Sequence, residues 1–157
     1  MIFQQITDKN RIIINNFIIE QWFTTKMIIR GNEIDMTTVE GIFALEGGKI
    51  IGLITYILND ETLEITSLDS LCENKGIGTA LLTKVVDEAK VRNCKRIVLI
   101  TTNDNINAMR FYQKRGFDMA CLYRNALDSS RKLKPEIPLI GENGIPLKHE
   151  IEFEMLL

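Results

Sequence analysis

Two glycines open a predicted helix in the segment Asn74-Lys75-Gly76-Ile77-Gly78-Thr79. Because glycine has no Cβ, the backbone N–H groups of this turn can approach a phosphate closely. The helix that begins there adds unpaired N–H groups and the positive end of its dipole. Residues 74 to 79 are therefore predicted to form an anion-binding cradle.

Two common phosphate-binding motifs do not fit this segment. A dinucleotide-binding fingerprint needs a third glycine where Leu81 stands. A P-loop needs the run Gly-Lys-Ser or Gly-Lys-Thr, which the chain does not contain. The cradle is thus predicted to serve a different phosphate-bearing ligand.

A second segment with chemical potential runs from Asn105 to Phe117, one predicted strand after the cradle. It carries a phenol, Tyr112, whose reference pKa of about 10 keeps it protonated at neutral pH and able to donate a proton. It opens on Asn105, which can cap the predicted helix or bond a ligand, and the two roles are compatible. Tyr112 is a candidate general acid, with a core aromatic as the alternative role.

Together the two segments resemble the acetyl-CoA-binding core of the GNAT superfamily of N-acyltransferases. That core combines a (Q/R)-x-x-G-x-(G/A) turn with an N-x-x-A-(x)3-Y-(x)3-G-F helix. The chain matches the second pattern at each keyed position and departs from the first at Glu73, where the family has Gln or Arg. The resemblance implies acetyl-CoA as cosubstrate, no metal, and transfer of the acetyl group to a small-molecule amine by direct attack in a ternary complex.

The resemblance also implies roles for the residues around the cradle. Backbone N–H groups of Ser67, Leu68 and Asp69 would bond the pantetheine arm and the thioester oxygen, and Tyr112 would protonate the departing thiolate. Glu64 is a candidate base for the amine, with water as the alternative. Because the Glu73 carboxylate would repel a pyrophosphate, the grip is expected from the backbone of residues 74 to 79 and from Lys75.

The acceptor is expected between the segment after the first helix and a long connection at residues 125 to 147. Candidate contacts are Trp22 and Arg30 on one side, and Arg124 and Arg131 on the other. Arginines there would favour an acceptor that bears a carboxylate or a phosphate, whereas the alternative is an ordinary solvated surface.

These groups must be positioned by a mixed set of elements. Apolar patterns predict strands at 2–6, 41–45, 49–58, 62–68, 96–102, 117–124 and 149–155, the last one half-exposed. A first helix is expected to be capped by Thr7 or Asp8 and to end near Trp22, with the other helices at 77–93 and 105–115 and a short one at 34–39. The apolar stripe of the first helix is predicted to be Ile12, Ile13, Phe17 and Ile18.

This order predicts an α/β fold in one GNAT-like domain over residues 1–157, with a mixed, mostly antiparallel sheet, a central β-α-β crossover and a splayed strand pair. A net charge of −2 and a pI near 5.5 disfavour a nucleic-acid partner. The three cysteines lack zinc-site spacing, and no signal peptide or membrane segment is apparent, so a cytoplasmic protein with free thiols is expected. A homodimer is left open.

Two other functions remain alternatives to the small-molecule transferase. One is a non-catalytic module that binds acyl-CoA and regulates a partner, which the presence of Tyr112 disfavours. The other is a protein N-acetyltransferase with a peptide acceptor. The 23-residue connection at 125–147 disfavours it, because a connection of that length can cover the groove and restrict it to small ligands.

Overall fold

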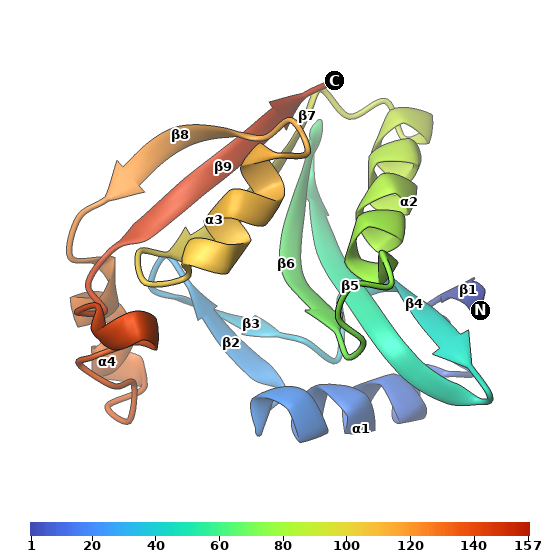
Figure 1. The fold of residues 1–157 in the computed structure, drawn as a ribbon, viewed down its shortest axis with the longest axis horizontal. Helices are drawn as coiled ribbons and strands as arrows, with labels where there is room; N and C mark the ends of the chain where they lie inside the picture. Colours follow the sequence, from blue (N-terminus) through green and yellow to red (C-terminus); the bar gives the residue numbers. More distant parts are fainter. The chain divides into compact units, whose positions relative to one another are not determined.

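The computed structural model describes residues 1–157, which form two compact units (Figure 1). The first unit holds Met1–Met27, Asp35–Ile97 and Leu157. The second holds Ile28–Ile34 and Val98–Leu156. The elements follow an α/β order and their sheets are mostly antiparallel, which confirms the predicted fold class.

The sheet of the first unit is built from antiparallel neighbours. Its strands are ordered β1 (Ile2–Gln5), β4 (Glu40–Glu46), β5 (Lys49–Asn59) and β6 (Thr62–Ser70). Gly47 and Gly48 join β4 to β5, and both have positive φ angles, 57° and 77°. A two-residue hairpin turn of this kind needs both values positive, which explains the two glycines. The predicted strands of this unit are confirmed to within two residues at each end.

Helix α1 (Arg11–Trp22) packs through a different stripe from the predicted one. Its buried residues are Ile14, Phe17 and Ile18, whereas the side chains of Ile12 and Ile13 are 75% and 50% exposed. The expected cap at Thr7 or Asp8 was also wrong, because Asn10 is the N-cap residue. Its side chain joins the preceding turn, accepting from the N–H of Thr7 at 2.8 Å and donating to the carbonyl of Gln5 at 3.0 Å.

Helix α2 (Ile77–Val91) covers the face of the sheet that carries Gly52. A Cβ at Gly52 would stand 2.7 Å from a methyl carbon of Ile77 and 3.0 Å from one of Leu81, so only glycine lets the helix come this close. The next residue pair in the register, Leu53 and Asp69, points to the opposite face because side chains alternate along a strand. Helix α1 lies on that opposite face, as Figure 1 shows.

The second unit has its own strands and helices. Strand β7 (Arg96–Thr102) begins in the first unit, and the sheet order here is β7, β9 (Glu150–Leu156) and β8 (Asp118–Tyr123). Helix α3 (Ile106–Gln113) follows β7 directly in the chain, at the position predicted for it. None of the helices in either unit has the length and hydropathy that a membrane-crossing helix requires.

Two of the expected elements were wrong. Instead of a short helix at 34–39, the chain forms a hairpin of β2 (Lys26–Ile29) and β3 (Asn32–Asp35), whose turn at Arg30 and Gly31 has φ angles of 50° and 72°. The 125–147 connection contains helix α4 (Ala126–Leu133) and a short 3-10 helix at Glu142–Gly144. All three prolines of the chain follow α4, so none of them interrupts it.

The last strand is also less exposed than its alternating pattern predicted. Glu150 is only 2% exposed, and its carboxylate accepts a hydrogen bond from the backbone N–H of Arg30 at 3.1 Å. Phe153, an apolar position of the alternation, is fully buried, as the pattern predicts. A buried carboxylate needs such a partner, and the turn at Arg30 provides it.

Candidate functional site

The site in the first unit begins with a β-bulge in β6. In the register of β5 with β6, Thr55 pairs with Ser67 whereas Tyr56 pairs with Ile65, so Thr66 is an extra residue. The Thr55 hydroxyl lies 2.7 Å from that of Thr66 and 2.5 Å from that of Ser67, and all three residues are buried. A bulge interrupts the ladder and redirects the strand, and here three hydroxyl groups fix its shape.

The bulge also decides which side chains share a face of β6. On the other side of the bulge, Glu64 pairs with Ile57, whose side chain points to the same face of β5 as those of Leu53 and Thr55. Glu64 therefore lies on the same face as Ser67 and Asp69, which simple alternation along β6 would not have placed together. Its side chain is buried, with the residue 4% exposed, and it lies roughly 13 Å from Asp69 along the strand, at about 3.3 Å per residue.

The turn after β6 leaves the start of α2 open to an anion. Asn74 and Gly76 have φ angles of 60° and 70°, a conformation that suits asparagine and glycine. No side chain caps α2, its first turn holds no acidic residue, and a Cβ at Gly76 would meet nothing within 4 Å. An uncapped helix start with open space before it is a ready anion site.

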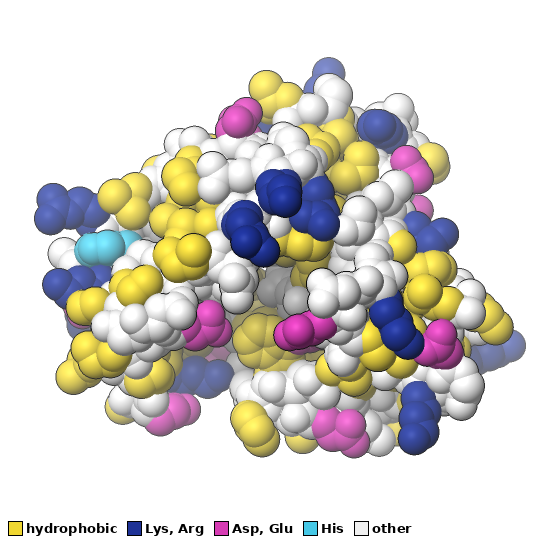
Figure 2. All heavy atoms as spheres, viewed as in Figure 1, with side chains coloured by type: hydrophobic (Ala, Val, Ile, Leu, Met, Phe, Trp, Pro, Cys, Tyr) yellow, Lys and Arg dark blue, Asp and Glu magenta, His cyan; other side chains and the backbone are white.

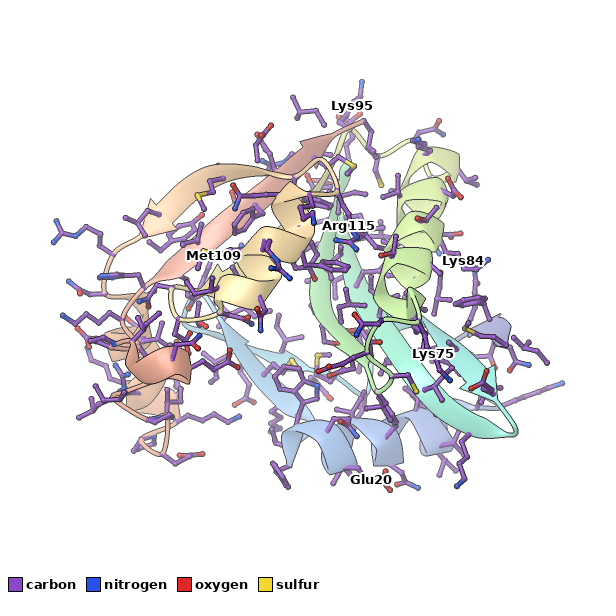
Figure 3. All side chains as sticks on the ribbon, in the orientation of Figure 1. Glu20, Lys75, Lys84, Lys95, Met109 and Arg115 are labelled. Atoms are coloured by element: carbon purple, nitrogen blue, oxygen red, sulfur yellow. The ribbon has the colours of Figure 1, made fainter.

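Charged side chains flank this turn. Lys75 forms an ion pair with Glu46, with 3.5 Å between its Nζ and a carboxylate oxygen, and both side chains are half-exposed. Figure 3 shows Lys75 in the turn that precedes α2 and Lys84 farther along that helix. Glu73 is exposed. At an exposed position an ion pair is weak, so Lys75 can turn toward a phosphate at little cost.

Next to the bulge, Trp22 and Asp69 make a contact that local sequence patterns do not predict. The indole Nε1 of Trp22, at the end of α1, donates to Asp69 Oδ2 at 3.1 Å. Burial raises the pKa of the Asp69 carboxyl, and the hydrogen bond from Trp22 opposes that shift in part. Local sequence patterns point only to the backbone of Asp69, because 47 positions separate Trp22 from Asp69 and no periodicity links them.

The second unit holds the other candidate residues of the sequence analysis. Asn105 caps α3, since its side-chain oxygen accepts from the N–H of Ala108 at 3.1 Å, which confirms the capping role. Tyr112 is 7% exposed and packs edge-to-face with Phe111 and Phe117, with ring centroids 5.1 and 5.5 Å away. These rings fix the direction of the phenol.

Basic side chains gather over α3, which the sequence analysis missed (Figure 2). The chain places Arg110, Lys114 and Arg115 at the end of this helix and just after it. The guanidinium of Arg115 lies 3.7 Å above the ring of Phe111, and its Nη1 donates to the Phe111 carbonyl at 2.8 Å. Three basic residues within six positions were the available signal for a phosphate contact.

The arginines proposed for the acceptor have different surroundings. Arg131 donates to the carbonyls of Ile137, Pro138 and Leu147, at 3.3, 2.7 and 2.6 Å. Arg30 pairs with Glu152 at 3.3 Å. Arg124 is exposed. The structure therefore uses Arg131 to hold the 137–147 segment against α4.

The sole histidine, like Arg131, makes hydrogen bonds that hold neighbouring segments together. His149 accepts the N–H of Asn125 through Nδ1 at 2.8 Å. The side-chain oxygen of Asn103 accepts the N–H groups of Lys148 and His149, both at 2.9 Å. These bonds tie the end of β7 to the residues that lead into β9.

Comparisons with known proteins identify the family of this chain. The model of the acetyltransferase (GNAT) family matches residues 10–117. The uncharacterized protein YdhI of Bacillus subtilis is 47% identical over 146 residues, which are 92% of this chain and 91% of that protein. A GNAT family acetyltransferase from Elizabethkingia anophelis, solved with acetyl-CoA bound, is 25% identical with a TM-score of 0.68 and covers 99% of this chain and 97% of its own.

An IAA acetyltransferase from Bacillus cereus shares the fold, with a TM-score of 0.71 at 23% identity and 99% of each chain covered. The matched residues 10–117 include the bulge of β6, the open start of α2 and the Asn105–Phe117 segment. This chain therefore belongs to the GNAT family of acetyltransferases.

Proposed function

We propose that this protein transfers the acetyl group of acetyl-CoA to the amine of a small molecule, by direct attack in a ternary complex. The observation that carries the proposal is the open, uncapped start of α2 directly after the bulged end of β6. Family membership supports acetyl transfer in general. The proposal goes beyond family membership by naming a small-molecule amine as the acceptor.

In this proposal the pyrophosphate of CoA lies over residues 74 to 79, where backbone N–H groups and Lys75 contact it. Backbone N–H groups of Ser67 to Asp69, displaced by the bulge, bond the pantetheine and the thioester oxygen. Donors aimed at a developing oxyanion contribute about 3 kcal/mol each to catalysis. The amide group of Asn105 adds a contact to the pantetheine, and the basic residues of α3 neutralise CoA phosphates.

Tyr112 is proposed to donate its phenolic proton to the thiolate of CoA as the C–S bond breaks. Glu64, or a water molecule, is proposed as the base that frees the attacking amine. Glu64 is on the same face of β6 as Ser67, which supports a role near the thioester. Its carboxylate would act through ordered water, because the strand separates it from Asp69 by roughly 13 Å.

The acceptor is proposed to be a small amine bearing an anionic group, with Trp22, Arg30, Arg124 and Arg131 as its candidate contacts. Because their surroundings differ, substitutions at two of these arginines should have different effects on stability. Arg131→Ala should lower thermal stability, because three carbonyls lose a charged donor worth about 1.5–3 kcal/mol per bond. Arg124→Ala, at an exposed position, should leave the melting temperature unchanged.

On an anionic acceptor, Arg124→Ala should lower kcat/KM by about 10- to 1000-fold, whereas an uncharged analogue should be unaffected. Differential scanning fluorimetry and steady-state kinetics on both compounds measure the two effects. If the ratio of kcat/KM for the anionic acceptor to kcat/KM for its uncharged analogue is the same in wild type and in Arg124→Ala, Arg124 does not contact the acceptor. The search for specificity would then turn to Trp22.

Glu73→Gln tests the departure from the family pattern at the cradle. Removing the exposed carboxylate beside the open start of α2 should hold or raise the affinity for CoA, by up to about fivefold, the scale of one charge near a helix end. Glu61→Gln, in the turn between β5 and β6, removes an equal charge away from the cradle and should change nothing. Titration calorimetry gives both affinities. A large loss in Glu73→Gln would mean that Glu73 contacts the ligand favourably.

A panel of amines with acetyl-CoA, followed by the release of free CoA thiol, tests the proposed function directly. Small amines should release thiol well above the rate without amine. A non-catalytic binding module would bind CoA without release by any amine. A protein N-acetyltransferase would release thiol with peptides and with none of the small amines.

A further inference from the structure

We propose that the side chains of Trp22 and Asp69 form the subsite for the acceptor's amine, in which Asp69 binds the ammonium group and takes its proton. This inference rests on the proposed function and deepens it, because it names a cationic primary amine as the reacting group of the acceptor. It assigns Asp69 a side-chain role in addition to its backbone, and it makes Asp69 the base that deprotonates the amine in place of Glu64 or water.

The position of Asp69 on β6 carries the argument. Its own backbone belongs to the three residues proposed to bond the thioester, directly beyond the bulge at Thr66. An amine held by its carboxylate is therefore within one side chain's length of those backbone donors. Glu64 lies roughly 13 Å back along the strand, so Asp69 is the carboxylate nearer to an amine at the thioester. The direct partner of the amine is thus Asp69.

The indole of Trp22 completes the subsite in two ways. Its Nε1–H holds Asp69 Oδ2 at 3.1 Å and fixes the carboxylate, which keeps further lone pairs for a ligand. The Trp22 side chain is 43% exposed, so its ring can also be reached from solvent. A carboxylate beside an accessible indole suits a cation, through an ion pair and a cation–π contact.

The electrostatics of Asp69 agree with a proton acceptor. Burial raises the pKa of its carboxyl above the ordinary value, which makes the ionised form a better base, and the Trp22 hydrogen bond limits the rise. Below this pKa the carboxyl is neutral and can neither attract an ammonium ion nor accept its proton. Activity should therefore rise with pH as Asp69 ionises.

The proton balance of the step is complete. The ammonium group gives one proton to the Asp69 carboxylate, and the resulting neutral amine attacks the thioester carbon. The C–N bond forms and the C–S bond breaks, Tyr112 gives its phenolic proton to the departing thiolate, and the second nitrogen proton, which leaves as the amide forms, reprotonates Tyr112. Asp69 then releases its proton to solvent, so the products are amide, CoA thiol and one proton.

Trp22 is the only tryptophan of the chain, so its fluorescence reports on the subsite without any turnover. The first experiment follows this fluorescence from acid to neutral pH. Wild type should show a transition as Asp69 ionises, and Asp69→Asn should lack it. Asp60→Asn, in an exposed turn with a φ of 52° that asparagine accepts, is the matched control and should keep the transition. An unchanged transition in Asp69→Asn would overturn the proposal.

The second experiment compares n-butylamine with n-butanol, which have similar shape and differ in charge. In the presence of CoA, the amine should perturb the Trp22 fluorescence of wild type, and Asp69→Asn should bind it at least about tenfold more weakly, since a charged contact is lost. Equal responses to the amine and the alcohol would overturn the subsite. Amine-specific binding without thiol release from any amine would support the subsite and contradict the proposed function.

Once an acceptor is found, kinetic measurements distinguish catalytic roles of Asp69 and Trp22 from structural ones. Asp69→Asn should lower kcat/KM by roughly 10² to 10⁴, the range for a general base. Trp22→Phe keeps a ring but removes the donor that lowers the pKa of Asp69, so the acidic limb of its pH–rate profile should move to higher pH. A merely structural Trp22 would lower the rate without moving this limb, and that result would overturn its assigned role.

Discussion

Gly78→Glu is expected to abolish the binding of acetyl-CoA while the protein stays folded. Gly78 lies in the first turn of α2, which has no side-chain cap and no acidic residue. A glutamate side chain there would fill the space of the pyrophosphate and add a charge that repels it. The same charge interacts favourably with the helix dipole, so the loss cannot come from a weakened helix.

Thr83→Glu is the matched control for this variant. It adds an equal charge to the same helix at an exposed position, beyond the first turn. Calorimetry should detect CoA binding to Thr83→Glu and wild type, and none to Gly78→Glu at equal concentrations. Retained affinity in Gly78→Glu would mean that CoA does not lie over residues 74 to 79.

Tyr112→Phe should lower the turnover rate by about 10² or more with little change in CoA affinity, the usual scale for the loss of a general acid. The phenylalanine ring keeps the edge-to-face contacts with Phe111 and Phe117, so the melting temperature should barely change. Single-turnover measurements of thiol release give the rate of the chemical step itself.

Tyr56→Phe provides the comparison, because it removes a phenol from the core of the first unit. Burial and the nearby Glu40 raise the pKa of Tyr56 to about 12, so this phenol stays protonated throughout the assay range. Its loss should leave the rate of the chemical step unchanged. If Tyr112→Phe shows an equal rate as well, with chemistry rate-limiting, Tyr112 is a core aromatic and the thiolate takes its proton from elsewhere.

The sequence was sufficient for the elements that have strong local signals. Apolar patterns predicted β4, β5 and α2, and the paired glycines at 47 and 48 fit the tight turn that joins the two strands. The β2–β3 hairpin was missed because Arg30 supplies one of its two positive φ angles, and arginine gives no turn signal. Helix α4 was missed because its eight residues carry a cluster of charges and precede three prolines.

The cradle was predicted because its chemistry is local, with glycines at the start of a helix. The bulge at Thr66 was not, since it exists only as a shift in the pairing of two strands. For the same reason, simple alternation along β6 could not place Glu64, Ser67 and Asp69 on one face. The contact of Trp22 with Asp69 depends on how α1 packs on the sheet, which no short pattern encodes.

The transfer of labelled acetyl groups tests the central claim most directly. Wild type is incubated with acetyl-CoA labelled in the acetyl group and with the amine panel, and both the labelled amide and the free CoA thiol are measured. The account predicts that label passes to at least one small amine, with one thiol released for each amide formed. Tight binding of acetyl-CoA with no labelled amide from any small amine would contradict it.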